Sequence, residues 1–288
     1  MSDRPHLSII ITSWNTCELI RQALQSILNH PPRVAYEIIV ADNGSEDGSA
    51  AMIVESFPTV RFIRNSHNEG FARANNQGAA MALGGTLVLL GSDVVIVDDS
   101  LQRMYEYLMH NGDVGAVSCR LLNPDGSPQR SCRRFPTLGD AVLTYLSLHN
   151  LATSYNIRDF DYDRTQEVDQ PAATCLMIRK SIVRSFGLFD ERYTILYNDV
   201  DLCKRLRDAG WKIVYCADAG IIHHGSQSTN RATPAVRLEM YRNILVYYFR
   251  NKGPLAVIVL LPILAVLLAV VNRGKGVLGL MSLKYLTR

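Results

Sequence analysis

The stretch Leu87-Val-Leu-Leu-Gly-Ser-Asp-Val-Val-Ile96 decides the fold of this chain. Its continuous apolar run predicts a strand buried on both faces, as in a parallel sheet covered by helices. The run ends at Gly91-Ser92 and delivers one carboxylate, Asp93, at the carboxyl end of the strand. Open α/β sheets bind their ligands at that end. Asp93 is therefore either a ligand-binding residue or part of an ordinary turn or helix cap.

The segments around this strand alternate between short apolar runs and helical periods. We expect a polar loop at 68–78 to open a helix ending near residue 83, and Thr16 could cap the first helix. Strands are expected at 7–12, 36–41, 60–65 and 115–121, and helices at 17–28, 49–56 and 100–111. This order predicts an α/β fold with a doubly wound, mostly parallel sheet.

A second strand end also carries a polar turn. Strand 36–41 stops at Asp42-Asn43-Gly44-Ser45, where the carboxylate can accept hydrogen bonds from a base or ribose, or stabilise its own turn. No GxGxxG follows the first strand, and the chain has no GxxxxGK[ST] loop. These absences argue against a dehydrogenase-type dinucleotide fold and against an ATPase.

The second half begins with basic residues that either face a phosphate-bearing ligand or are simply solvated: Arg130, Arg133 and Arg134. We expect a helix at 141–151, a flexible surface loop at 155–170, a strand at 172–179 and a short helix at 180–186. Asn198-Asp199 then opens an amphipathic helix that ends at Gly210.

Two carboxylates, Asp199 and Asp201, lie at the start of this helix, although capping needs only one of them. A carboxylate held there is well placed to act as a general base. After a strand at 211–217 come His223-His224-Gly225. Adjacent side chains on extended backbone point in opposite directions, so at most one histidine is expected to be a ligand.

Composition and charge limit the compartment and the partners. The 288 residues are 48% hydrophobic, and six scattered cysteines without CxxC spacing indicate reduced thiols. The polar N-terminus carries no signal peptide, so the catalytic part is expected in the cytosol. From Arg237 to Arg288 eight Lys/Arg face one acid, giving +7 against −4 for the remainder, because the whole chain carries +3. This asymmetry indicates an anionic surface as a partner, either a membrane or nucleic acid.

Six separated motifs occur in an order that resembles the inverting family 2 glycosyltransferases with the GT-A fold: Ile11-Thr-Ser-Trp-Asn15, Val40-Ala-Asp-Asn-Gly-Ser-Glu-Asp-Gly48, Asn68-Glu-Gly-Phe71, Ser92-Asp93-Val94, Asn198-Asp-Val-Asp-Leu202 and His223-His224-Gly225. The resemblance covers about residues 7–250 and is greatest to rhamnosyltransferase-type enzymes of cell-envelope polysaccharide synthesis. It implies a GT-A domain at 1–250. A Rossmann-like nucleotide-sugar-binding half would occupy about 1–115, and an acceptor and catalytic half about 116–250.

The resemblance also implies roles for individual residues. Asp199 would be the catalytic base, and Asp93 and His223 would bind Mg²⁺ or Mn²⁺. The donor would contact Thr12, Asn15, Asp42, Gly70, Arg73, Asn76 and Ser92, and the acceptor would contact Trp14, Arg134 and Asp201.

Two departures from the family pattern matter. The DxD motif is reduced to Gly91-Ser92-Asp93, and the usual Glu-Asp pair is Asn198-Asp199. The first leaves one carboxylate for the metal, which predicts modest metal affinity, with the substrate diphosphate supplying other ligands.

The C-terminal segment, 251–288, is hydrophobic and basic. Leu255–Val271 is an uninterrupted apolar run whose helix would be about 25 Å long, short of a hydrocarbon core of about 30 Å. Pro262 would kink this helix. We therefore favour a re-entrant or interfacial membrane anchor over a membrane span or a buried core helix. Residues 240–249, aromatic and mildly amphipathic, would lie at the membrane interface.

The expected protein is a peripheral or monotopic enzyme on the cytoplasmic face of the inner or plasma membrane. It would move a sugar such as rhamnose from a dTDP- or UDP-sugar to a lipid-linked or glycan acceptor, with no nucleic-acid partner. A processive synthase would need several transmembrane helices and a Gln-x-x-Arg-Trp signature. A nucleotidyltransferase would need a basic, glycine-rich loop after the first strand. A non-catalytic nucleotide-sugar-binding protein is supported only by the departures at Ser92 and Asn198.

Overall fold

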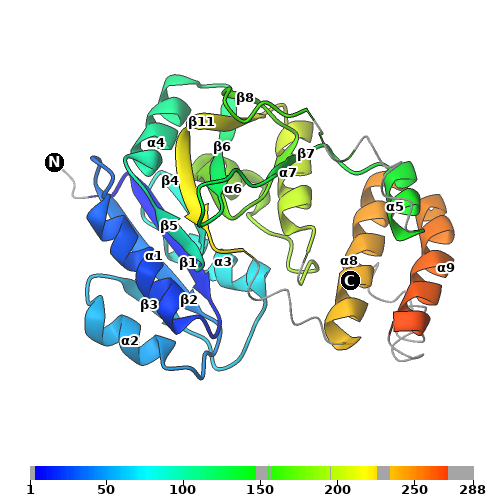
Figure 1. Ribbon diagram of the computed structural model, residues 1–288, viewed down its shortest axis with the longest axis horizontal. Coiled ribbons are helices and arrows are strands. Elements are labelled where there is room, and N and C mark those ends of the chain that lie inside the picture. The colour runs from blue at the N-terminus through cyan, green and yellow to red at the C-terminus, as the bar shows by residue number, and fades with distance from the viewer. Residues whose placement is uncertain are drawn as a thin grey trace.

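The computed structural model describes residues 4–146, 155, 157, 159–194, 196–225 and 234–271. In this part of the chain, nine strands form one sheet in the order β3-β2-β1-β4-β10-β6-β11-β5, with β8 beside β11 (Figure 1). The N-terminal strands are β1 (Leu7–Ser13), β2 (Tyr36–Asp42), β3 (Arg61–Arg64) and β4 (Thr86–Gly91). They pair in parallel and are linked by α1 (Cys17–Asn29), α2 (Ser49–Ser56) and α3 (Phe71–Met81).

The second half of the sheet is mixed. The strand β10 (Cys175–Arg179) lies between β4 and β6 (Val114–Leu122) and is antiparallel to both. The long strand β11 (Lys212–His223) runs parallel to β6, and β5 (Val94–Ile96) pairs antiparallel with β11. The other elements of this half are α4 (Ser100–His110), β8 (Gln166–Glu167), α6 (Lys180–Phe186), α7 (Asn198–Asp208) and a two-stranded ribbon of β7 (Cys132–Arg133) with β9 (Gln170–Pro171).

The sheet has an apolar core on each face, because side chains alternate along its buried strands. On β1, Ile9 and Ile11 join the core under α1, α2 and α4, whereas Ile10 joins the core under α3, α6 and α7. The helix α3 approaches β1 closely at Gly78, where a Cβ atom would lie 2.5 Å from Ile10 Cγ2. Glycine at this position lets the helix lie directly on the strand.

A third apolar core joins the C-terminal helices to the rest of the protein. The helices α8 (Pro234–Lys252) and α9 (Pro254–Val271) pack on each other, and α9 also packs on α5 (Leu138–Tyr145), as Figure 1 shows. Tyr247 and Tyr248 of α8 are at most 1% exposed in this core. The prediction that residues 240–249 lie at a membrane interface is therefore wrong for these tyrosines, because their rings fill the space between α8 and its neighbours.

The helix α9 has two different apolar faces. Its buried face consists of Ala256, Val257, Leu260, Leu264 and Leu268. The opposite face, called here the outer face of α9, consists of Leu255, Ile258, Val259, Val266 and Val270, which are 42–73% exposed. The helix continues through Pro262. Within the described residues, no helix combines the length and the apolar character that crossing a membrane would require. Residues 272–288 lie outside the described part.

Most predicted elements are present, and the differences have local causes. The predicted helix at 141–151 begins earlier, at Leu138, because Thr137 and Asp140 form a capping box; residues 147–151 are not described. The predicted surface loop at 155–170 is wrong in part. It contains β8 and β9, and the rings of Phe160 and Tyr162 pack against Tyr215 of the core.

Candidate active site

The candidate site lies at the carboxyl ends of β1, β2 and β4. Ser13 of β1 is opposite Asp42 of β2, and Thr12 is opposite Gly91 of β4. Because parallel strands end at one edge of a sheet, the loops that follow them converge there. Thr12, predicted to contact the nucleotide, is half-buried at this edge.

The turn after β2 uses its aspartate internally. Asp42 is fully buried, and its carboxylate accepts hydrogen bonds from both the backbone amide and the hydroxyl of Ser45. Ser45 Oγ accepts a bond from the Asn15 amide at 2.9 Å, and Asn15 Oδ1 accepts one from the Glu46 amide at 2.8 Å. Asp42 thus fastens the β2–α2 turn to the β1–α1 loop, and contacts of Asp42 and Asn15 with a base or ribose remain predictions.

The β1–α1 loop is also joined to the end of β4. Thr16 Oγ1 donates to Ser92 Oγ at 3.1 Å, one residue before Asp93. The Thr16 side chain makes no hydrogen bond that caps α1, which corrects the prediction. Instead, Asp47 Oδ2 accepts from the Cys17 amide at 2.8 Å. Trp14 is 45% exposed on the same loop, so its predicted contact with an acceptor is sterically open.

Three residues predicted to contact the donor lie around the start of α3. Gly70 has φ of +86°, a conformation that favours glycine. Arg73 is 54% exposed and forms an ion pair with Glu69 at 3.0 Å. Both polar atoms of the Asn76 amide bond to the backbone of Phe189, so Asn76 ties α3 to the loop before α7. Contacts of these three residues with the donor remain predictions.

Asp93 and His223 are far apart in the chain and meet because β5 pairs with β11. His223 Nε2 lies 3.4 Å from Asp93 Oδ2, and the two side chains are 16% and 13% exposed, Asp93 the more exposed of the two. Adjacent ligands of one octahedral ion, each about 2.1 Å from it, lie about 3 Å apart, so the pair fits two positions around Mg²⁺ or Mn²⁺. Among the described residues no group of three or more His, Cys, Asp or Glu side chains is arranged to hold a metal ion.

Asp199 lies in the first turn of α7 with both carboxylate oxygens engaged. Oδ1 accepts from the Val200 amide at 2.9 Å, and Oδ2 accepts from Gln170 Nε2 at 3.1 Å. Burial raises the pKa of Asp199 above its ordinary value, although the Val200 amide and the charge of Arg133 act in the opposite direction. An ionised carboxylate with a raised pKa is a stronger proton acceptor, which suits a general base.

A short segment before β10 connects this carboxylate to the metal-binding pair. The backbone of Ala173 acts to lower the pKa of Asp199, and the carbonyl of the next residue, Thr174, accepts from the Gly91 amide at 2.9 Å. Gly91 precedes Asp93 by two residues. Gln170, which bonds to Asp199, and Thr174, which bonds to Gly91, belong to the same segment, so this segment joins Asp199 to the end of β4 beside Asp93.

Asp201 has a different environment from Asp199. It is 4% exposed, and its Oδ2 accepts from Arg205 Nε at 2.7 Å. The same guanidinium donates to the carbonyl oxygens of Phe186, Gly187 and Leu188. Asp201 therefore orients the arginine that fastens α7 to the loop after α6. This role is structural, and the predicted contact of Asp201 with the acceptor stays a prediction.

The arginines 130, 133 and 134 are all exposed, and none of them enters an ion pair in the described part of the chain. Arg133 is the partner of Gln170 in the β7–β9 ribbon, and its guanidinium carbon lies 5.6 Å from the centre of the Tyr155 ring. The Arg134 amide donates to the Tyr155 carbonyl at 3.0 Å. Because Gln170 also bonds to Asp199, a cation and an aromatic ring lie beside the candidate base.

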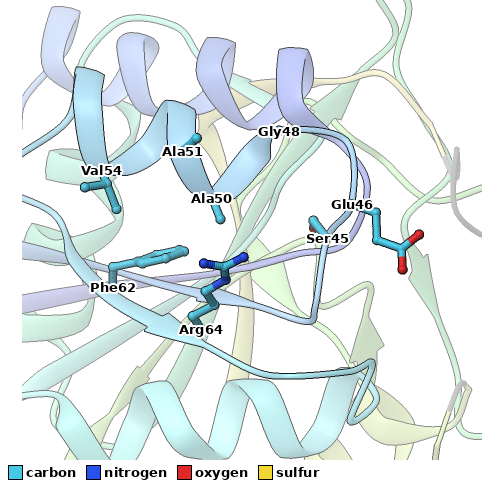
Figure 2. A pocket seen from close by; sticks show the side chains of 8 residues that line it. All are labelled: Ser45, Glu46, Gly48, Ala50, Ala51, Val54, Phe62 and Arg64. Carbon is cyan, nitrogen blue, oxygen red and sulfur yellow. The ribbon is translucent and has the colours of Figure 1, made fainter.

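A pocket of about 700 Å³ lies next to the Asp42 turn, between α2 and the edge strand β3. Figure 2 shows Phe62 and Arg64 reaching into it from β3, with Ala50, Ala51 and Val54 of α2 opposite. Its lining includes Ser45 but neither Asp93 nor Asp199. This pocket is therefore separate from the groups that could carry out chemistry.

Two residues that orient the candidate site were not predicted: Gln170, which bonds to Asp199, and Gln129, whose Oε1 lies 2.8 Å from His223 Nδ1. Neither belongs to a motif or to a periodic pattern. Their contacts join positions 29 and 94 residues apart, so only the folded sheet shows them.

In a transfer reaction, a carboxylate such as Asp199 can accept the proton of the attacking hydroxyl group. A cation bound by a pair such as Asp93 and His223 can stabilise the leaving phosphate. The arrangement lies at the carboxyl edge of an α/β sheet, where such folds bind their ligands. The chain belongs to Glycosyl transferase family 2, whose profile matches residues 8–186.

Two similar proteins have informative names. The N-acetylglucosaminyl-diphospho-decaprenol L-rhamnosyltransferase of Mycobacterium tuberculosis is 29% identical over 235 residues, covering 75% of each chain. The O-antigen biosynthesis protein RfbC of Myxococcus xanthus is 27% identical over 228 residues, 78% of this chain and 18% of that protein. The protein is thus a rhamnosyltransferase-like member of the family, as the motifs predicted.

Solved structures share the fold. The mannosyltransferase PcManGT of Pyrobaculum calidifontis, in complex with GDP-Man and Mn²⁺, superposes with a TM-score of 0.58 at 18% identity, over 97% of this chain and 73% of that one. GalNAc-T7, with UDP, GalNAc and Mn²⁺, gives 0.63 at 14% identity, over 85% and 48%. The predicted α/β, GT-A-like fold with a mostly parallel, mixed sheet is confirmed.

The two i,i+4 ion pairs on α7, Asp201–Arg205 and Lys204–Asp208, are expected to contribute differently to stability. Asp201→Asn should lower the free energy of unfolding by about 1–3 kcal/mol, because it weakens a charged hydrogen bond at a buried site. Asp208→Asn is the matched control: the Lys204–Asp208 pair has the same i,i+4 spacing, but Asp208 is 60% exposed. Its effect should stay below about 0.5 kcal/mol. Urea unfolding measures both, and equal effects would contradict the structural role of Asp201.

Proposed function

We propose that this protein is an inverting hexosyltransferase that moves rhamnose or a related sugar from a dTDP- or UDP-sugar to a hydroxyl group of a lipid-linked or glycan acceptor. The observation that carries this proposal is that the segment before β10 bonds to Asp199 through Gln170 and, through Thr174, to the end of β4 beside the Asp93–His223 pair. Asp199 can activate the acceptor hydroxyl group, and a cation held by the Asp93–His223 pair can stabilise the departing diphosphate. The family membership supplies the reaction class, and the named relatives support the sugar and the acceptor.

On the acceptor side, the Asp199 carboxylate takes the proton of the attacking hydroxyl group. The oxygen forms a bond to the anomeric carbon on the face opposite the nucleotide, while the bond from that carbon to the phosphate oxygen breaks. The electron pair leaves with the nucleoside diphosphate, and the configuration at the carbon is inverted. Gln170 and the Val200 amide hold the carboxylate in one orientation during this step.

On the donor side, Asp93 Oδ2 and His223 Nε2 are the two protein atoms that would hold Mg²⁺ or Mn²⁺. A divalent cation bound there supplies positive charge against the charge that develops on the leaving diphosphate. Arg73 is exposed at the start of α3 and paired only with Glu69 among the ion pairs of the described residues, so it can turn toward the donor phosphates.

The acceptor region fits an amphiphilic molecule. Arg133 and Tyr155 lie beside Asp199, and from Arg133 the chain continues through the exposed Arg134 to α5, which packs on α9 (Figure 1). A sugar hydroxyl at Asp199 would place an attached diphosphate near these arginines and a lipid chain toward α9. The M. tuberculosis relative carries such an acceptor in its name, a diphospho-decaprenol.

The outer face of α9 is proposed to lie on the membrane surface that holds this acceptor. Burying one Leu, Ile or Val side chain contributes about 1.5–3 kcal/mol, whereas each basic residue near anionic lipid contributes about 1 kcal/mol. The five exposed apolar side chains and the net charge of +7 on the last 52 residues therefore contribute binding free energies of the same order. The protein would sit peripherally on the cytoplasmic side, where nucleotide sugars are available.

The role of Asp199 is tested with the purified protein, after a donor panel scored by release of dTDP or UDP has identified the active donor. Asp199→Asn should lower kcat by about 10²–10⁴-fold with donor binding kept, because a general base is lost. In the wild type, kcat/KM should fall as the pH drops through the raised pKa of Asp199, since only the ionised carboxylate accepts a proton. Asp208→Asn on the same helix is the control. Activity of the Asp199 variant within a few-fold of wild type would remove Asp199 from this role.

If Arg133 binds the diphosphate of the acceptor, its replacement should change KM for some acceptors and not for others. Arg133→Gln should raise KM about 10–100-fold for an acceptor with a lipid diphosphate, because a charge-assisted hydrogen bond is lost. KM for an uncharged glycoside of the same sugar should change little. Arg184→Gln, an exposed arginine on α6, is the control. An equal loss with both acceptors would show that Arg133 supports Asp199 and does not bind phosphate.

The outer face of α9 predicts membrane binding that can be removed without unfolding. The double variant Ile258→Glu, Val266→Glu should shift the protein from the bound to the free fraction when it is sedimented with anionic vesicles. Val54→Glu, at a residue of α2 that is 60% exposed, should bind vesicles like the wild type. Transfer to a short water-soluble acceptor should be the same in all three proteins. Wild-type protein that does not sediment with vesicles would rule out this membrane contact.

A further inference from the structure

Gln129 holds both the ring and the backbone of His223. It lies just after the turn that follows β6, where its own amide donates to the Leu121 carbonyl at 2.8 Å. Its Oε1 lies 2.8 Å from His223 Nδ1, and its Nε2 donates to the His223 carbonyl at 2.8 Å and to Asn123 Oδ1 at 2.9 Å. All the donor and acceptor positions needed to orient this side-chain amide are therefore used.

These contacts decide which atom of the amide faces the imidazole. A backbone carbonyl can only accept, so the nitrogen of the Gln129 amide must face the His223 carbonyl. The amide oxygen then faces Nδ1, and because that oxygen also only accepts, Nδ1 must carry the hydrogen. In the neutral ring the lone pair is consequently on Nε2.

Nε2 is the atom that faces Asp93. Its distance to Asp93 Oδ2, 3.4 Å, is longer than an ordinary N–H···O hydrogen bond, as expected of two atoms that both offer lone pairs. Two such atoms repel each other unless a cation lies between them. The arrangement is therefore the one a divalent ion requires, with the imidazole nitrogen and the carboxylate oxygen both available.

We propose that Gln129 is a positioning residue for the divalent-cation site: it fixes His223 in the Nδ1–H tautomer and directs the Nε2 lone pair beside Asp93. This inference rests on the metal site of the proposed function and assigns a residue outside every motif. A partner of this kind on the second ring nitrogen orients a metal-binding histidine and raises its basicity. Gln129 touches neither the donor nor the acceptor in this scheme, and it acts only through His223.

The tautomer can be measured without any metal. In metal-free protein labelled with ¹⁵N-histidine, at a pH where the His223 signals are those of a neutral ring, they should show a protonated Nδ1 and an unprotonated Nε2. His223→Ala identifies these signals by their loss. Gln129→Met removes the acceptor while keeping the length of the side chain, so the preference for Nδ1–H should be lost. A Gln129→Met protein that keeps the Nδ1–H form would overturn the proposal.

Metal binding is the second measurement, with Mn²⁺ alone as the probe and free Mn²⁺ followed by electron paramagnetic resonance. Gln129→Met should weaken Mn²⁺ binding about 10–100-fold, the usual effect of removing such a partner. Gln129→Glu keeps an acceptor for Nδ1 and should stay within a few-fold of the wild type. Gln166→Met, which loses a single bond to the Asp161 carbonyl, is the matched control and should bind normally.

The controls separate this inference from the proposed function. If His223→Ala weakens Mn²⁺ binding and Gln129→Met does not, Gln129 has no positioning role, although the metal site stands. If His223→Ala also binds Mn²⁺ normally, the metal site itself is wrong. Thermal unfolding in EDTA checks the fold of each variant. If Gln129→Met does not fold, Gln129→Glu decides: the Nδ1–H form with near-normal affinity supports the proposal, and loss of either one overturns it.

Discussion

The antiparallel pairing of β10 with both β4 and β6 is the constraint on which the geometry of the site depends. This strand comes from the second half of the chain and enters the sheet next to the strand that carries Asp93. The residues that lead into it, 170–174, contact Asp199 through Gln170 and contact the end of β4 through Thr174. A register shift of one residue in β10 would turn every one of its side chains to the other face and separate these contacts.

The C-terminal helices take part in the same construction. Tyr197 precedes α7 with φ of +69°, a strained conformation for a bulky side chain, and its ring lies 5.0 Å from that of Tyr247 on α8. Arg250 of α8 also forms an ion pair with Asp190, in the loop that leads to α7. The segment before α7, the helix that carries Asp199, therefore contacts α8, and α8 packs on α9. Side chains in contact thus connect the proposed membrane-binding helix to the candidate site.

The sequence predicts the first half of the fold well, because each βα unit there is local and its apolar period is clear from Leu7 to His110. It predicts the second half less well. The ribbon of β7 and β9 is too short for a periodic signal, so Gln170 was assigned to a loop. The motif order predicts that Asp93 and His223 meet, and the structure brings them together. Which atoms orient them could not be read from the sequence, since Gln129 and Gln170 act across 94 and 29 residues.

The charge balance of the cation site limits how the proposed donor and metal bind. Asp93 is the single carboxylate of the pair, so a divalent ion there keeps about one unit of positive charge in a place that is less than one-fifth exposed. Leaving that charge uncompensated is costly at low dielectric constant. A nucleoside diphosphate supplies both the missing negative charge and the missing oxygen ligands. The proposed metal and donor should therefore stabilise each other in the site, and loss of the diphosphate after transfer would also loosen the metal.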